Sequence, residues 1–321
     1  MARVAGVSRA TVSAYINKTR FVSPELSQKI QKVIDELNYT PDELARSLKM
    51  QDTKTIGLII PVLSNFFMPM LQSINEVAQK QGYSFLLYSS EENLKRERKM
   101  LEIFMSKRIS GILIVPSSEE NRKFMMQIIE HGMPLVQVNR KIIGLETDYV
   151  ISKNFSGIYK ATEYILKKGR KKILFVGYNA NVFGEDEKKY GYEAAIKDYR
   201  VNKYIINIIA HDPESILESL NEFFLSGEKI DGMVCDSQMR TSVALQYLKN
   251  NSLRIPDDIS FIGYEDTYTF LYDPPLTVIS ERASEMGKIA TNLLLDRIKK
   301  KDKKGIESVL LDLDFIIRES C

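Results

Sequence analysis

The chain contains few of the side chains on which metal centres, disulfide scaffolds and nucleophilic enzymes depend. Its 321 residues include two cysteines, two histidines and no tryptophan. Cys235 and Cys321 cannot build a disulfide framework, which favours a reducing compartment. His131 and His211 stand far apart and outside any metal-ligand spacing, so both are expected to be surface or capping histidines. The sequence predicts no metal, no cofactor and no catalytic cysteine–histidine pair.

Long hydrophobic runs and nucleotide-binding glycine motifs are also absent. No basic segment followed by an apolar run opens the chain, and the apolar stretch at 56–63 is far too short to span a bilayer. The residues after this stretch, 61–65, read Pro-Val-Leu-Ser-Asn rather than a GxGxxG fingerprint. Neither a GxxxxGK[ST] phosphate loop nor a GxSxG nucleophile turn occurs. The sequence therefore predicts a soluble, cytoplasmic protein that is not an enzyme.

Charge is nearly balanced over the whole chain but not along it. The formal net charge is +3, and residues 1–50 contain eight Lys/Arg and five Asp/Glu, so the excess lies in this segment. Residues 1–20 contain four basic residues and no acidic one. A basic end on a neutral body is typical of a protein that contacts phosphates at one end only.

The N-terminal segment has the pattern of a helix-turn-helix. Gly6 supplies the backbone freedom that a tight turn requires, and Ser8 is a good N-cap for the next helix. Val12 and Ile16, with Tyr15 beside them, would form the inner face of that helix. The outer face carries short or polar side chains able to enter a major groove, which are Arg9, Ala10, Ser13, Ala14 and Asn17. The alternative is a capped surface helix that contacts no DNA.

The helix before the turn has little chain to form it. Residues 1–4 make about one helical turn, which is marginal without tertiary support. The first helix is therefore expected to be truncated. Either the start of the chain is misassigned, or the protein binds DNA weakly.

Two further helices are expected in the first 50 residues. Ser23-Pro24 begins one that runs to about Leu37. A second, at 41–48, has Thr40 as its N-cap, with a proline at its first position and a glutamate that completes a capping box. Because this helix has only two turns, we expect it to form conditionally. Residues 51–54 would be a linker.

From residue 55 onward, short β-branched strands alternate with amphipathic helices. Strands are expected at 56–60, 85–88, 111–115, 134–138, 172–176, 205–209, 232–235 and 259–262. Helices are expected at 67–81, 95–106, 157–168 and 215–225. Continuous apolar strands separated by helices indicate parallel sheets covered on both faces, here in two doubly wound lobes with a cleft between them. Ligands bind such sheets beyond the carboxyl ends of the strands.

Ten short segments, in order along the chain, carry a resemblance to a known family. They lie at 5–13, 22–25, 37–41, 44–48, 55–61, 64–67, 255–260, 263–266, 274–277 and 318–320. Together they resemble the LacI family of bacterial transcription regulators. The resemblance implies a small all-α headpiece at 1–50, with a helix-turn-helix at 1–37 and a hinge helix at 41–48. It also implies a periplasmic-binding-protein-like α/β core at 51–321, with an N-lobe at about 55–152 plus 280–304 and a C-lobe at about 153–279 plus 305–321.

The resemblance implies a homodimer that reads a pseudo-palindromic operator. Arg9 would pair with a guanine and Ala10 would touch a thymine methyl group. Ala14 stands where relatives often have a polar reader. Leu48 of the hinge helix would be a wedge in the minor groove, unless it packs against its own domain. The expected DNA contacts are Arg3, Ser8, Arg9, Ala10, Thr11, Ser13, Ala14, Asn17, Lys18, Ala45, Leu48 and Lys49, with Arg20 adding non-specific attraction.

The resemblance also places a small-molecule effector in the cleft. The expected contacts are Asn65, Phe66, Phe67, Glu91, Arg140, Lys188, Ser237, Gln238 and Glu265. Phe66 and Phe67 would stack on a sugar ring, unless one of them is core. Val62 and Lys153 replace aspartates of the family pattern, and Lys188 replaces an arginine. We therefore expect a cationic cleft that takes an anionic or phosphorylated ligand rather than a neutral sugar.

The sequence predicts an operator-binding transcriptional regulator, a repressor, whose affinity for DNA is controlled by a sugar or sugar derivative. Two alternatives belong to other classes. A stand-alone sugar-binding module with little or no DNA binding would fit the truncated first helix. An enzyme could use the cleft, but no set of residues supports it.

Overall fold

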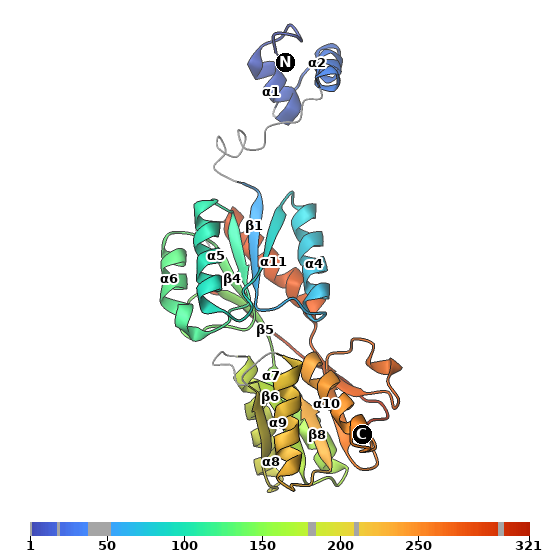
Figure 1. Cartoon of the computed structure of the whole chain (residues 1–321). Helices are drawn as coiled ribbons and strands as arrows, with labels where there is room; N and C mark the ends of the chain where they lie inside the picture. Colours follow the sequence, from blue (N-terminus) through green and yellow to red (C-terminus); the bar gives the residue numbers. More distant parts are fainter. Residues whose placement is uncertain (1, 18–19, 38–52, 179–183, 209–211, 301–304) are drawn as a thin grey trace. The chain divides into compact units, whose positions relative to one another are not determined.

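The computed structural model describes residues 2–17, 20–37, 53–178, 184–208, 212–300 and 305–321 (Figure 1). The chain forms two compact units, Met1–Thr53 and Lys54–Cys321. We call them the headpiece and the core. The predicted hinge helix at 41–48 lies outside the described residues. None of the described helices is both long enough and apolar enough to cross a membrane.

The headpiece contains α1 (Arg9–Asn17) and α2 (Pro24–Glu36). Ser8 caps α1, because its Oγ accepts a hydrogen bond from the Thr11 N–H at 3.0 Å. Gly6 has a φ of +65°, as the predicted tight turn requires. Residues 2–6 before α1 form hydrogen-bonded turns rather than a described helix. The Tyr15 hydroxyl donates to Gln31 Oε1 at 2.8 Å, which ties α1 to α2.

The N-lobe of the core is a parallel sheet covered on both faces. In sheet order its strands are β11 (Ser308–Leu311), β5 (Asp148–Ser152), β4 (Leu135–Asn139), β3 (Gly111–Ile114), β1 (Thr55–Ile60) and β2 (Ser84–Ser89). One face packs against α4 (Phe67–Lys80) and α11 (Ala283–Lys299). The other packs against α5 (Leu94–Ser106) and α6 (Arg122–Glu130), which follows the short 3₁₀ helix η1 (Glu119–Asn121).

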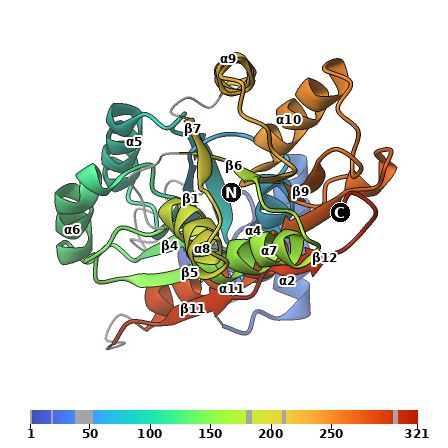
Figure 2. The same cartoon turned by 90° about the horizontal axis from the view of Figure 1, so that it is seen from below.

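The C-lobe repeats this plan. In sheet order its strands are β12 (Asp314–Ile316), β10 (Thr277–Ser280), β9 (Ser260–Tyr264), β8 (Gly232–Cys235), β6 (Ile173–Tyr178) and β7 (Tyr204–Ile208), and β12 is antiparallel to β10. Helices α7 (Asn154–Lys167) and α8 (Glu185–Asp198) lie on one face, and α9 (Pro213–Leu225) and α10 (Gln238–Asn250) on the other (Figure 2). A 3₁₀ helix, η2 (Thr269–Leu271), precedes β10.

The fold class is confirmed, because two doubly wound lobes follow a helical headpiece. One predicted boundary is wrong. Residues 305–321 were expected in the C-lobe, but β11 pairs with β5 in the N-lobe, and only β12 joins the C-lobe sheet. The physical reason is that β11 covers the open edge of β5, while Leu311 and Val309 pack into the N-lobe core.

Candidate functional site

The exposed face of α1 is the candidate DNA-contact surface. Arg9, Ala10 and Ser13 are exposed on this helix, and Thr11 is half-buried. Arg3 and Ser8 are exposed in the turn that precedes it. The first turn of α1 contains no acidic side chain, so the positive end of the helix dipole is not neutralised there. The structure therefore presents Arg9 and Ala10 to solvent, as a major-groove reader requires.

Ala14 does not belong to this surface, and its prediction as a DNA contact is wrong. Its exposed fraction is 3%, although it was expected to lie beside Ser13 on the outer face. Successive residues of a helix are rotated by about 100°. Viewed along the helix axis, the inner face of α1 extends from Ala14 past Tyr15 to Val12. This face is therefore wider than the predicted stripe of Val12 and Ile16.

Several predicted DNA contacts are not tested by the structure. Lys18, Ala45, Leu48 and Lys49 lie outside the described residues. Asn17 is described as the last residue of α1. DNA contact at these positions stays a prediction.

A cavity of about 550 Å³ lies between the two lobes, at the carboxyl ends of their strands. This is where doubly wound sheets bind ligands, and the volume is within the range of small-molecule sites. Eight of the nine predicted effector contacts line it, which are Asn65, Phe66, Phe67, Arg140, Lys188, Ser237, Gln238 and Glu265. Phe67 is buried in the N-lobe core, whereas Phe66 is half-buried, so one of the two aromatic residues is indeed core.

Glu91 is the predicted effector contact that does not line this cavity. It is exposed and pairs with Arg96 at the surface. Its neighbour Glu92 points the other way and binds Arg140, with Nη1 to Oε1 at 2.9 Å. Both Glu91 and Glu92 have a φ of 52°, in the left-handed region. This turn decides which of the two adjacent carboxylates reaches Arg140, and the sequence alone gives no sign of it.

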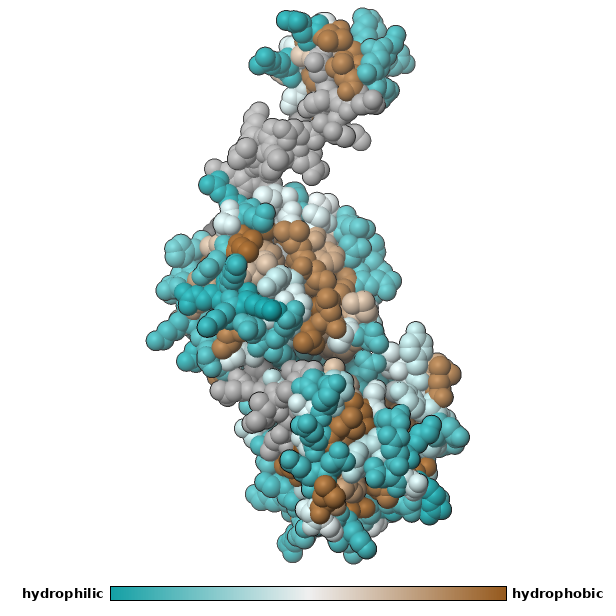
Figure 3. Space-filling model, viewed as in Figure 1, coloured by the Kyte–Doolittle hydropathy of each residue, from teal (hydrophilic) through white to brown (hydrophobic). Residues whose placement is uncertain are grey.

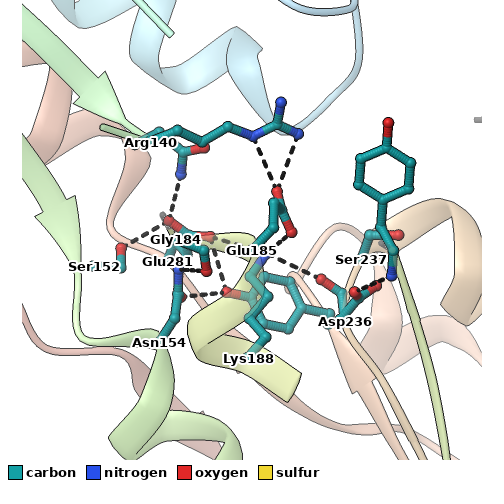
Figure 4. Close-up of polar contacts among 12 residues, drawn as sticks. Arg140, Ser152, Asn154, Gly184, Glu185, Lys188, Asp236, Ser237 and Glu281 are labelled. Carbon is teal, nitrogen blue, oxygen red and sulfur yellow. Dashed lines mark hydrogen bonds and ion pairs between the residues drawn. The ribbon is translucent and has the colours of Figure 1, made fainter. Parts of the chain in front are cut away.

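The cations of the cleft are bound by carboxylates of the same chain (Figure 4). Arg140 Nε donates to Glu185 Oε1 at 3.1 Å and thereby links the N-lobe to α8 of the C-lobe. Lys188 Nζ lies 3.2 Å from Glu185 Oε2. Burial alone would raise the pKa of Glu185, but Lys188 and Arg140 hold it well below its usual range. Arg240, which is fully buried, pairs with Asp236.

The prediction of a cationic cleft is wrong. Its three cations, Arg140, Lys188 and Arg240, are outnumbered by Glu92, Glu185, Asp236, Glu265 and Glu281, which surround or line the cavity. Lys153 is not in the lining, because it pairs with Asp312 at 2.9 Å on the surface. Sequence reasoning missed the acidic residues that replace the lost ones. Asp236 follows a predicted strand directly and could have been found by that position.

Glu281 joins the two lobes where the chain crosses between them. Its Oε2 accepts hydrogen bonds from Asn139 Nδ2 and Ser152 Oγ, both at 2.7 Å, from the N-lobe. Its Oε1 accepts from the Tyr264 hydroxyl of the C-lobe at 2.8 Å. Figure 4 shows Ser152 directed toward the Glu281 carboxylate. Glu281 thus has a structural role at the back of the cleft as well as a place in its wall.

Glu265 has no such set of donors. Its carboxylate accepts hydrogen bonds from the Glu281 N–H at 3.1 Å and the Ser280 hydroxyl at 3.3 Å. Burial and the charge of Glu281 raise the pKa of Glu265 to about 8, although Lys188 opposes the shift. At neutral pH this buried carboxyl group is therefore mostly protonated.

The histidine and cysteine side chains take no part in either surface where they are described. His131 is the C-cap residue of α6, and its Nδ1 lies 2.6 Å from the Gln127 carbonyl, as expected for a capping histidine. His211 is outside the described residues. Cys235 is buried and Cys321 half-buried, both as free thiols. Among the described residues, no three His, Cys, Asp or Glu side chains are grouped so as to hold a metal ion.

Two family profiles match the chain. "Bacterial regulatory proteins, lacI family" matches residues 1–42, and "Periplasmic binding proteins and sugar binding domain of LacI family" matches residues 53–319. Relatives include the HTH-type transcriptional repressor PurR of Histophilus somni (strain 2336), 31% identical over 324 residues, and the ribose operon repressor of Haemophilus influenzae (strain ATCC 51907 / DSM 11121 / KW20 / Rd), 31% identical over 333 residues. Each comparison covers 100% of this chain and 97% of the relative.

Solved structures share the fold. The lac repressor dimer bound to operator and the anti-inducer ONPF has a TM-score of 0.88 at 20% identity, covering 99% of this chain and 97% of that one. The complex of transcriptional regulator CelR with cellobiose has a TM-score of 0.76 at 22% identity, covering 100% of this chain and 98% of that one.

Proposed function

We propose a mechanism on the premise that this chain belongs to the LacI family of bacterial regulatory proteins, as a DNA-binding transcriptional repressor controlled by a small-molecule effector. The headpiece binds an operator through the exposed face of α1, and the interlobe cavity binds the effector. The observation that carries the proposal is that one chain combines an exposed, acid-free reading helix with a ligand-sized cavity. A repressor of this kind works in the cytoplasm, where the bacterial chromosome lies.

In this proposal Arg9 reads a base, and the residues around it hold the phosphates. Arg9 stands at the N-terminus of α1, where an arginine can reach the edge of a guanine, and Ala10 beside it is small enough to approach a thymine methyl group. Thr11 and Ser13 contact phosphates or neighbouring edges, and Arg3 adds charge. The hinge helix at 41–48 and its Leu48 wedge remain part of the proposal as the sequence predicts them.

The effector acts by favouring one arrangement of the two lobes. Arg140 and Glu185 come from opposite lobes, and their ion pair forms part of the cavity wall. A ligand that contacts either residue changes the free energy of closing the lobes. It can shift the operator affinity only by the difference in its affinity for the two arrangements.

The chain acts as a homodimer in this proposal. The edge strand β2 exposes Leu86 and Leu87, and Met68 is exposed on α4. In the C-lobe, the segment around η2 exposes Phe270 and Leu271. Figure 3 shows apolar surface on both lobes of the core. Apolar groups exposed in this way are typical of surfaces that a partner covers, and a second copy would also present a second headpiece to a pseudo-palindromic site.

The experiment that tests this function is selection of a duplex from a pseudo-palindromic library, followed by gel shift with the full chain. We expect Arg9→Ala to weaken binding at least about fivefold, since a bidentate base contact contributes about 1–3 kcal/mol. Binding should also fall steeply with salt concentration. Lys29→Ala is the matched control, because Lys29 is an exposed cation of α2 paired with Glu25.

Two results would defeat the proposed function. If no duplex is enriched at low salt, the alternative of a sugar-binding module without DNA binding is favoured. If Arg9→Ala and Lys29→Ala lose affinity equally, general charge rather than α1 determines binding.

A further inference from the structure

The carboxyl group of Glu265 is the acidic group in the cleft that lacks a cation. Glu92, Glu185, Asp236 and Glu281 each lie within 4 Å of an arginine or lysine nitrogen. Among the described residues, no arginine or lysine nitrogen lies within 4 Å of the Glu265 carboxyl group. Glu265 lines the cavity, and the exposed fraction of the whole residue is 7%. A buried carboxyl group that faces a ligand site without a counter-charge is suited to a cationic ligand group.

The groups around Glu265 leave this position open for such a group. Glu281 is a second carboxylate at the same wall, and it is also part of the cavity lining. Lys188 is the cation of this region, but its Nζ is taken up by Glu185 at 3.2 Å and the Asp236 carbonyl at 3.2 Å. Tyr264 offers its ring to Lys188 at 4.4 Å and its hydroxyl to Glu281. Lys188 therefore acts on Glu265 only through its more distant charge, against that of Glu281, and forms no ion pair with it.

The lining of the cavity also includes apolar side chains. Phe66 is half-buried there and packs edge-on against Phe67, with ring centroids 4.8 Å apart. Val62 and Met239 also belong to the lining. A ligand in this space can contact an aromatic ring as well as the carboxyl groups of Glu265 and Glu281. That combination fits a ring compound with an apolar face and a polar edge.

We propose that the effector carries a protonated amine seated against Glu265, and that its class is the amino sugars. The proposal rests on the proposed function, since it names the ligand of the same cleft. The ammonium group donates hydrogen bonds to the Glu265 carboxylate, and the ring stacks on Phe66. Neutral sugars carry no positive charge to pair with a Glu265 carboxylate, and anionic sugars are repelled by the excess of carboxylates.

Proton exchange gives this assignment a distinctive signature. The amine keeps its proton on binding, while the Glu265 carboxyl group releases its own proton to the buffer and becomes a carboxylate. The step therefore liberates up to one proton per ligand at a pH where Glu265 is protonated and the amine is charged. A neutral sugar that accepts or donates hydrogen bonds at the same group releases none.

The test is isothermal titration calorimetry on the full chain at pH 6.5, with glucosamine, galactosamine and mannosamine against glucose, galactose and mannose. We expect at least one amino sugar to bind about tenfold more tightly than its parent hexose, as for a hydrogen bond between charged groups. Repeating the titration in two buffers of different ionisation enthalpy should report a release close to one proton. Glu265→Gln should abolish both the preference and the proton release, and Glu91→Gln, the exposed carboxylate outside the cleft, should retain both.

The proposal is overturned if parent hexoses bind as tightly as amino sugars, if none of the six binds, or if binding releases no proton. Tighter binding of glucosamine 6-phosphate than of glucosamine would overturn it in favour of an anionic ligand. These outcomes are separate from the fate of the proposed function, which is judged by gel shift of the selected duplex without any sugar.

Discussion

At the scale of single residues, the protonation of Glu265 makes the stability of the core depend on pH. Its pKa is about 8 in the folded chain, compared with an ordinary value of 4.5, because the carboxyl group is buried beside Glu281. The folded state therefore binds this proton more tightly than the unfolded state does. The resulting stabilisation is complete below about pH 4.5 and is lost as the pH rises through about 8.

We predict that Glu265→Gln removes this dependence. The contribution of Glu265 to the free energy of unfolding should decline between pH 5 and pH 8.5 in the parent chain and vanish in the variant, as measured by urea denaturation at a series of pH values. Glu91→Gln, whose side chain is exposed, should follow the parent. Parallel profiles for the parent and Glu265→Gln would show that Glu265 titrates normally.

The burial of Ala14 leads to a second residue-scale prediction. Ala14→Gln should destabilise the headpiece by about 1–3 kcal/mol, because the amide would be overpacked and its polar atoms buried without partners. Ala10→Gln, on the exposed face of the same helix, should leave stability unchanged. Hydrogen–deuterium exchange of α1 in the full chain measures the difference. Equal exchange in both variants would place Ala14 on the open surface after all.

The sequence correctly predicted residues of the cavity lining where their position after a strand places them there. Phe66, Arg140 and Glu265 follow strands, and the carboxyl ends of parallel strands meet at one edge. Prediction failed where the contacts of a residue depend on a side chain from another part of the fold. The choice of Glu92 over Glu91 depends on two left-handed residues, and the neutralisation of Arg140 depends on Glu185 from the other lobe.

At the scale of elements, β11 shows which parts of the fold a sequence does not specify. The central strands are buried on both faces, so they appear as continuous apolar runs and were predicted. β11 is a four-residue edge strand with one well-buried side chain, and its sequence is equally suited to either lobe. Its assignment follows from the unpaired edge of β5, which is a tertiary property.

Because β11 belongs to the N-lobe sheet, we predict that substitutions of the adjacent residues Leu310 and Leu311 lower the free energy of unfolding by different amounts. Leu311→Ala should cost about 2–5 kcal/mol of unfolding free energy, because this side chain packs in the N-lobe core. Leu310→Ala should change stability by less than about 0.5 kcal/mol, since Leu310 is half exposed. Urea denaturation of the two variants provides the comparison. Equal losses would mean that β11 does not present Leu311 to the core.

At the scale of the whole molecule, the exposed apolar side chains of the core predict a dimer. Leu271→Asp should raise the dimer dissociation constant at least tenfold, because a buried unpaired carboxylate is costly. Leu225→Asp is the control, since Leu225 is also highly exposed, at the end of α9, away from η2 in the sequence. Sedimentation velocity over a concentration series distinguishes them. A fully monomeric parent chain would contradict the proposed assembly.

In the proposed function, binding of an effector in the cleft and of DNA at α1 are thermodynamically coupled, and such coupling must be reciprocal. The measurement is the operator affinity of the full chain by fluorescence anisotropy, without and with a saturating amount of the sugar that binds most tightly in calorimetry. We expect the operator affinity to change at least fivefold, and the affinity for the sugar to change by the same factor when operator is present. Operator affinity that is identical with and without the bound sugar would contradict it.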